Sequence, residues 1–133
     1  RYEVVIPITG GEPYAEISFL EAPWPGVAFH EVWPDWRSYS TLVVDLAVNG
    51  DKPLSLNLRV HDHAHRRSNR FNDRFNRTID LDPGRHTLSI SLNDLRYAPD
   101  SREMDLGNVS ELIIFGTRSE AGRSFRLYGI HLE

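Results

Sequence analysis

The sequence predicts an all-β domain in which two antiparallel sheets pack face to face as a sandwich. Its 133 residues suit one domain with one hydrophobic core. In most segments apolar residues alternate with polar ones, which is typical of strands that bury one face. Gly, Pro and Asn residues mark turns between these segments at short intervals, as in sandwiches and barrels.

Nine strands are predicted, namely residues 2–8, 14–20, 26–33, 40–48, 54–62, 73–81, 86–92, 110–116 and 123–132. The apolar residues that alternate within them are, in chain order, Val4, Ile6, Ile8, Ala15, Ile17, Phe19, Leu54, Leu56, Leu58, Val60, Phe75, Ile79, Leu81, Leu88, Ile90 and Leu92. Arg77 is the one exception to the pattern in 73–81. Residues 93–97 are expected to form a helical turn, and 98–108 a loop that crosses between the sheets.

Turn signals separate the predicted strands. They are Thr9-Gly10-Gly11-Glu12-Pro13, Asn49-Gly50-Asp51, Asp82-Pro83-Gly84 and Glu120-Ala121-Gly122. The third lies directly between two alternating runs, so we expect it to connect a β-hairpin.

Composition excludes several classes of protein. The formal net charge is −4, whereas a nucleic-acid-binding domain usually carries a basic excess. The absence of cysteine excludes disulfides, cysteine zinc sites and thiol nucleophiles. No apolar run approaches the roughly 18 residues that span a bilayer. Because the chain starts at Arg1 and opens into a strand, we expect residues 1–133 to be one domain cut from a longer protein.

Arginine is far more common than lysine in this chain. Lys52 is the only lysine, against fourteen arginines. Genomic bias is one explanation. The other is that some arginines face a polyhydroxyl or carboxylate ligand, because a planar guanidinium suits bidentate recognition.

The alternation also predicts a polar outer face. If the strands 54–62, 73–81 and 86–92 are neighbours, their outward positions form one polar platform. Its members are Asn57, Arg59, His61, Arg74, Asn76, Thr78 and Ser89. Planar amide, guanidinium and imidazole groups have fixed donor geometry, which matches the paired hydroxyls of a sugar. The alternative is an ordinary solvated sheet face.

Two aromatic residues are candidates for stacking on the apolar face of a sugar ring. Trp24 lies between Pro23 and Pro25, which predicts an exposed loop position, although it could instead close one end of the sandwich. Tyr97 lies in the predicted helical turn and could line a groove. Trp36 is expected in the core.

Histidines and acids offer two kinds of metal site. His61, His63 and His65 would share one face of an extended strand, about 6.6 Å apart at successive positions, as zinc or nickel ligands could. The alternative is a polar strand end that runs into a loop. A structural calcium would need oxygen ligands, for which the candidates are Glu3, Asp62, Asn72 and Asp73.

Nothing in the sequence marks an active site. The acids that could form a glycosidase pair are scattered and are Glu16, Asp62, Asp73, Glu103 and Asp105. No nucleophile-elbow, phosphate-loop or dinucleotide motif occurs. We therefore expect a binding domain rather than an enzyme.

Several motifs in residues 33–133 point to one family. Trp36-Arg37-Ser38-Tyr39 and Leu42-Val43-Val44-Asp45-Leu46 fit the pattern W-x-x-Y-x-x-L-x-x-D-x, and Asn49-Gly50 follows as a turn. Residues 84–92, then Asp94-Leu95, fit a G-x-x-T-x-x-I-x-L-x-D-L pattern, and residues 109–115 and 125–132 fit two closing strands. These motifs resemble calcium-type jelly-roll carbohydrate-binding modules, a galactose-binding-like fold. Leu127-Tyr128-Gly129-Ile130 lacks the acid that helps to hold the family's calcium.

Two further motifs are similar to a narrower group. Asp73-Arg74-Phe75-Asn76 and Arg102-Glu103-Met104-Asp105-Leu106 resemble signatures of the soluble domain attached to bacterial VanZ-like membrane proteins. This resemblance implies a bacterial domain at an extracellular, periplasmic or cell-surface location, tethered to a membrane or catalytic domain.

The resemblance implies a non-catalytic, monomeric domain that binds a polysaccharide or oligosaccharide. The expected ligand-binding residues are Trp24, Asn57, Arg59, His61, Asp62, His63, Arg70, Asp73, Arg74, Asn76 and Tyr97. One alternative is a protein-interaction or structural domain, which predicts an exposed apolar patch. The other is a small glycan-active enzyme, which predicts facing carboxylates in a pocket. Asp73 and Arg74 could also be purely architectural.

Overall fold

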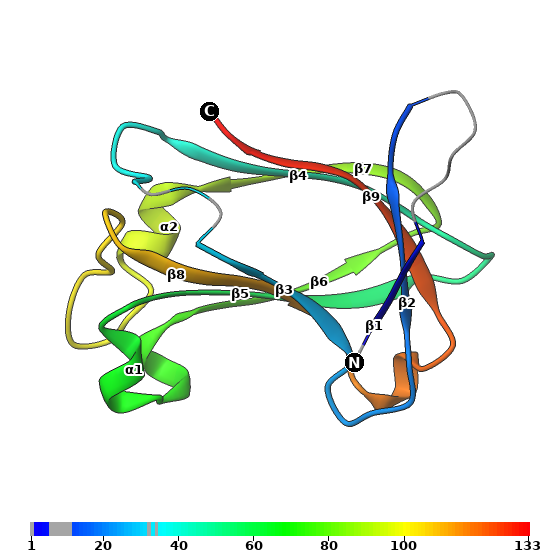
Figure 1. The fold of residues 1–133 in the computed structure, drawn as a ribbon, viewed down its shortest axis with the longest axis horizontal. Helices are drawn as coiled ribbons and strands as arrows, with labels where there is room; N and C mark the ends of the chain where they lie inside the picture. The colour runs from blue at the N-terminus through cyan, green and yellow to red at the C-terminus, as the bar shows by residue number, and fades with distance from the viewer. Residues whose placement is uncertain (1, 6–11, 32, 34) are drawn as a thin grey trace.

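The computed structural model describes residues 2–5, 12–31, 33 and 35–133 and confirms the predicted two-sheet antiparallel β-sandwich (Figure 1). One sheet has five strands in the order β1-β2-β9-β4-β7, and the other has four in the order β3-β8-β5-β6. The five-stranded sheet contains β1 (Tyr2–Val5), β2 (Ala15–Phe19), β9 (Ser124–Leu132), β4 (Thr41–Val48) and β7 (Gly84–Ser91). The four-stranded sheet contains β3 (Gly26–His30), β8 (Val109–Phe115), β5 (Leu54–Asp62) and β6 (Phe75–Leu81).

The predicted strands match the observed ones closely. Each of the nine strands overlaps a predicted one, and residues 6–8 of the first prediction lie outside the described residues. The predicted helical turn is α2 (Leu92–Arg96), whose N-cap Ser91 accepts a hydrogen bond from the Asn93 amide. Three short helical segments were not predicted. They are α1 (His65–Ser68), η1 (Phe71–Asp73) and η2 (Arg118–Glu120).

The turn at Asp82-Pro83-Gly84 does not connect a hairpin, so that prediction is wrong. The strand before it, β6, pairs with β5, whereas the strand after it, β7, pairs with β4 in the opposite sheet. The turn therefore carries the chain from one layer to the other. Its Gly84 has a φ of 105°, which glycine adopts readily and other residues rarely do. The local sequence marks a turn, but it does not reveal which strands the flanking residues pair with.

The core lies between the two sheets and follows the predicted alternation. Leu54, Leu56, Leu58 and Val60 of β5 are all buried, and the intervening residues up to Arg59 face outward. The opposite sheet contributes Leu42, Val44, Leu46 and Val48 of β4 to the same cluster. Trp36 is 1% exposed and packs edge-on against Trp33 at one end, as expected for a core residue.

None of the helices in the described ranges is both long enough and apolar enough to cross a membrane.

Candidate functional site: a groove on the outer face of the four-stranded sheet

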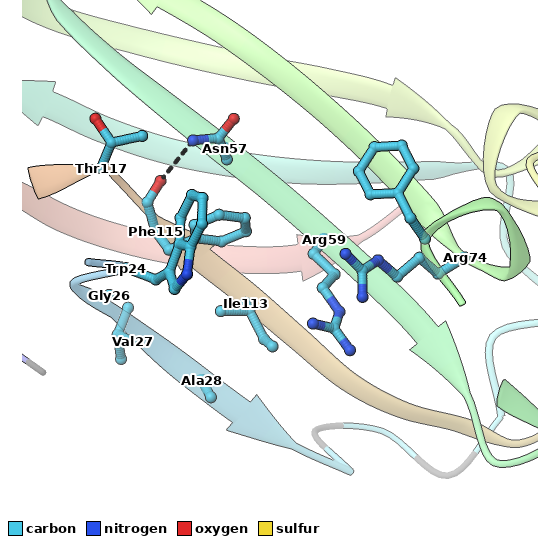
Figure 2. A pocket seen from close by; sticks show the side chains of 11 residues that line it. Trp24, Gly26, Val27, Ala28, Asn57, Arg59, Arg74, Ile113, Phe115 and Thr117 are labelled. Atoms are coloured by element: carbon cyan, nitrogen blue, oxygen red, sulfur yellow. Dashed lines mark hydrogen bonds between the residues drawn. The ribbon is translucent and has the colours of Figure 1, made fainter. Parts of the chain in front are cut away.

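A groove of about 750 Å³ runs over the outer face of the four-stranded sheet (Figure 2). Strands β3, β8 and β5 form its floor, and Trp24 of the β2–β3 loop and Phe71 of η1 contribute to its walls. The lining residues are Trp24, Gly26, Val27, Ala28, Asn57, Arg59, Phe71, Arg74, Ile113, Phe115 and Thr117.

Antiparallel pairing arranges the floor in two rows. Gly26, Phe115 and Asn57 lie opposite one another in the first row. Ala28, Ile113 and Arg59 form the second row, two residues further along each strand. The β3 members of both rows are small, and this leaves open space above the sheet. At position 26 a Cβ atom would overlap Phe115, so only glycine allows β3 to lie this close to β8.

Trp24 and Phe115 form the aromatic end of the groove (Figure 2). Trp24 is 68% exposed, as its flanking prolines predict. Its ring meets that of Phe115 edge to face, with 6.3 Å between centroids and an interplanar angle of 82°. This contact orients an indole whose faces remain largely accessible to a ligand.

Arg59 and Arg74 form the cationic end of the groove (Figure 2). Both side chains are half-buried. The Nε of Arg59 is buried with no hydrogen-bond partner among the described residues, and its Nη2 lies 3.5 Å from His65 Nε2. Arg74 donates from Nε to Asn76 Oδ1 at 2.9 Å and packs over the Phe71 ring, 5.2 Å from its centroid. Burial lowers the pKa of both guanidiniums, and the Arg59 charge lowers that of Arg74 further.

Two amide side chains complete the polar part of the surface. Asn57 accepts a hydrogen bond from Thr78 Oγ1 at 2.6 Å and donates to the Phe115 carbonyl at 3.4 Å. Asn76 donates to the Phe71 carbonyl at 2.9 Å. Both amides also line a smaller hollow of about 150 Å³ beside the groove. Each amide has more donors and acceptors than these bonds use, so both can still serve a ligand.

His61 occupies the outward position that the alternation predicts, but it is only 4% exposed. Its Nε2 lies 3.2 Å from Glu111 Oε2, and its ring lies 4.8 Å from that of His65. Burial, followed by the positive charge of Arg59, lowers the pKa of His61 to about 4. The ring is therefore neutral at physiological pH, and His61 is not among the residues that line the groove.

The three histidines do not share one strand face. Strand β5 ends at Asp62 and α1 begins at His65, so the extended alternation stops between them. The half-buried His63 points to Glu31, with 3.1 Å between Nε2 and Oε1. Within the described part of the chain, no three His, Asp or Glu side chains are grouped so that they could hold a metal ion.

Asp62 and Asp73 lie inside the protein rather than at the groove. Asp62 is 0% exposed, and its carboxylate accepts hydrogen bonds from both terminal nitrogens of Arg102, at 2.6 and 2.8 Å. Arg102 also donates to both oxygens of Asp73, at 2.8 and 3.2 Å, and Ser68 Oγ donates to Asp73 at 2.6 Å. A guanidinium thus already supplies the counter-charge that a calcium ion would bring. Asn72 is exposed nearby, and nothing of the Glu3 side chain is described.

Three other predicted residues lie away from the groove. Arg70 is exposed just before η1 and is not among the lining residues. Tyr97 caps the C-terminus of α2, where it is 64% exposed. Ser89 was expected on the same polar platform, and this prediction is wrong, because β7 belongs to the opposite sheet. The platform depended on β6 and β7 being neighbours, and the turn between them separates the two layers.

Sequence reasoning missed most of the apolar lining, of which Phe71, Ile113 and Phe115 are the largest residues. The signal for the last two was present in β8, where Ile113 and Phe115 interleave with the buried Leu112 and Ile114. A strand that is apolar on both faces has a second surface to cover. Phe71 is 69% exposed within a polar segment, and exposure of this kind leaves no periodic signal.

Comparison with known proteins supports the fold assignment. No family model matches the sequence, and no curated protein matches it. Among solved structures, the family 11 carbohydrate-binding module from Clostridium thermocellum, in complex with a β-1,3-1,4-mixed-linked tetrasaccharide, is similar with a TM-score of 0.74 and 15% identity. That match covers 99% of this chain and 82% of the module. The family 11 module of the cellulosomal cellulase Lic26A-Cel5E from the same organism is similar with a TM-score of 0.68 and 15% identity. That match covers 99% of this chain and 81% of the module.

A longer chain contains a similar domain. An exo-β-agarase matches with a TM-score of 0.75 and 16% identity over 99% of this chain, which spans 22% of the agarase. At these identities the likeness establishes the fold. The chain therefore has the β-sandwich fold of family 11 carbohydrate-binding modules.

Proposed function

We propose that this chain is a non-catalytic carbohydrate-binding module whose groove holds a stretch of an oligosaccharide or polysaccharide. The observation that carries the proposal is the combination of residues in one open groove. An exposed indole lies at one end beside Phe115 and Asn57, and guanidinium donors lie at the other end, where Arg59 follows Asn57 by two residues along β5. Ligand sites typically join apolar surface to a few well-placed polar groups in this way.

Each part of the groove matches one feature of a sugar. The apolar face of a pyranose ring can pack on Trp24, as rings do on other amphipathic aromatic surfaces. Sugar hydroxyl groups can accept hydrogen bonds from Arg59 and Arg74, and they can both donate to and accept from the Asn57 amide. Hydrogen bonds to charged groups contribute about 1.5–3 kcal/mol each. A few of them offset the entropy cost of association and leave binding in the micromolar range, near −8 kcal/mol.

The acids near the groove support binding over catalysis. Most glycoside hydrolases use two carboxyl groups about 5–9.5 Å apart across the scissile bond. Among the described residues that line the groove, none is Asp or Glu. Glu111 is the acid next in line on β8, and its two oxygens face His61 and His30, at 3.2 and 3.4 Å.

The structural neighbours support a glycan as the ligand class. One of them is a module in complex with a mixed-linked tetrasaccharide, and another is a domain within an agarase chain. By analogy with the second, and with the motifs at 73–76 and 102–106, we propose that this domain is attached to a membrane-associated or catalytic part of a longer protein. We place it outside the cytoplasm, where polysaccharides are found.

Affinity electrophoresis tests the proposal. The gels contain mixed-linked β-glucan, agarose or pectate, and a non-binding protein of similar size and charge runs alongside. We expect at least one polysaccharide to retard the chain relative to that reference. A chain that migrates with the reference in every gel, and gives no heat of binding with the matching oligosaccharides, would contradict the proposal.

A docking surface for another protein is the second candidate function. The observation that favours it is the apolar character of the lining. Trp24 and Phe71 are 68% and 69% exposed, and Ile113 and Phe115 of β8 belong to the floor of the groove. Exposed apolar patches mark interaction sites as well as ligand grooves. The electrophoresis separates the two, because a protein-docking surface predicts no glycan retardation.

A further inference from the structure

The geometry points to an acidic polysaccharide as the ligand, whose carboxylate or sulfate groups bind between Arg59 and Arg74 at the cationic end of the groove. This inference rests on the proposed function and specifies its ligand class. The two anions share one chemistry here, since both offer several oxygens with delocalised charge to a guanidinium. Three observations support it.

The first observation is that Arg59 and Arg74 lack an acidic partner. Of the other described arginines, Arg37, Arg77, Arg85, Arg102 and Arg126 each lie within 4.0 Å of an acid. Six do not: Arg66, Arg67, Arg70 and Arg118 are exposed to water, and Arg96 and Arg123 are half-buried. Arg59 differs from these six because its Nε is buried and has no hydrogen-bond partner among the described residues. Arg59 and Arg74 are half-buried like Arg102, yet no described carboxylate lies within that distance of either. A half-buried charge without a counter-charge is unfavourable.

The second observation is that their protein neighbours cannot neutralise these two charges. Nη2 of Arg59 lies beside Nε2 of His65, and Arg74 donates a hydrogen bond to the neutral amide of Asn76. Glu111 attracts Arg59 at longer range, but its oxygens already face His61 and His30. The two guanidiniums also repel each other, which is why Arg59 lowers the pKa of Arg74. An anion bound between the two guanidiniums would supply the missing counter-charge and would also reduce their mutual repulsion.

The third observation is the spacing between the two ends of the groove. Arg59 is two residues from Asn57 on β5, and Asn57 lies opposite Phe115 at the aromatic end. Positions two residues apart on one strand face are about 6.6 Å apart. An acidic glycan can therefore pack one ring on Trp24 while a neighbouring charged group reaches the arginines. The planar forks of both arginines suit bidentate binding of such groups.

Isothermal titration calorimetry with two matched pairs of ligands tests the inference. One pair is oligogalacturonate and its methyl ester, and the other is a neutral agaro-oligosaccharide and its O-sulfated form. We expect the acidic member of at least one pair to bind at least tenfold more tightly than its neutral partner, and 0.5 M NaCl to reduce that preference. The pair that shows the preference distinguishes carboxylate from sulfate.

Variants assign the effect to the cationic end. The double variant R59Q/R74Q should lose the preference for the acidic member. The control K52Q/R96Q also removes two positive charges, but at positions outside the groove lining, and should keep it. Thermal unfolding confirms that each variant is folded, and the single variant R74Q replaces the double one if R59Q/R74Q is not.

The outcomes separate this inference from the proposed function. Equal affinity for both members of each pair, or a preference that survives in R59Q/R74Q, overturns the acidic ligand and leaves a neutral glycan-binding module. Binding to no member of either pair, and to no polysaccharide in the electrophoresis, overturns both proposals.

Discussion

Arg102→Met should lower the free energy of unfolding by about 3 kcal/mol, because it leaves two inward-facing carboxylates without their partner. Arg102 donates to Asp62 and Asp73, of which the first is fully buried. The Asp62 carboxylate also accepts hydrogen bonds from the backbone amides of His65 and Asp105. It therefore links the end of β5 to α1 and to the loop before β8. Methionine preserves most of the side-chain volume, so the effect isolates the lost charge.

Arg85→Met is the matched control for this loss. Arg85 also bridges two carboxylates, those of Glu12 and Asp45, but this cluster lies on the solvent-exposed face of the five-stranded sheet. Exposed ion pairs contribute little, because water already stabilises the separated charges. Urea denaturation of both variants measures the difference. Equal destabilisation by the two substitutions would mean that the Arg102 network carries no special weight.

The same network predicts a dependence of stability on pH. Hydrogen bonds from Arg102 lower the pKa of Asp73 to about 2. Burial alone would raise the pKa of Asp62, but its bonds to Arg102 and to backbone amides hold it below the usual value. Stabilisation from depressed carboxyl pKa values is complete above about pH 4 and is lost as the pH falls toward 2. Arg102→Met should remove this contribution, so its unfolding free energy should fall less steeply over that window.

Trp24→Ala should weaken glycan binding at least 30-fold, which corresponds to about 2 kcal/mol for the loss of an aromatic residue that dominates a contact. Trp24 supplies the exposed stacking surface of the groove, and Phe115 holds it at an angle of 82°. Because 68% of Trp24 is exposed before any ligand binds, its removal should leave the melting temperature nearly unchanged. Calorimetry with the glycan that retards the chain measures the affinity.

Tyr97→Ala provides the control for this substitution. Tyr97 is 64% exposed, close to the value for Trp24, but it caps α2 and does not line the groove. Its removal should leave the affinity unchanged. Loss of binding in Tyr97→Ala but not in Trp24→Ala would place the ligand at the α2 end of the sandwich and contradict the proposed groove.

The sequence predicted the strands well because a two-residue period is a local property. Leu54–Val60 alternates without exception, and the structure buries each apolar member. Pairing between strands is not local, and so β7 was assigned to the wrong layer. The turn residues Asp82-Pro83-Gly84 allow the chain to reverse, and both a hairpin and a crossing between sheets require that reversal.

The site was predicted in part, for a related reason. Alternation identified the outward positions of Asn57 and Arg59, which line the groove. It could not reveal that α1 places His65 against His61 and Arg59, because no periodic signal predicted that short helix. Nor could it reveal that Asp62 pairs with Arg102, forty residues away in the sequence. Contacts of this kind depend on how the loops pack.

NMR spectroscopy gives the most direct test of where a glycan binds. Among the three tryptophans, only the indole N–H signal of Trp24 should shift when the glycan is titrated, since Trp36 lies in the core and Trp33 packs against it. Backbone amide shifts should concentrate at Phe115 and Arg59. An unmoved Trp24 signal, with shifts gathered instead around Arg85 on the outer face of the five-stranded sheet, would show that this groove is not where the chain holds a sugar.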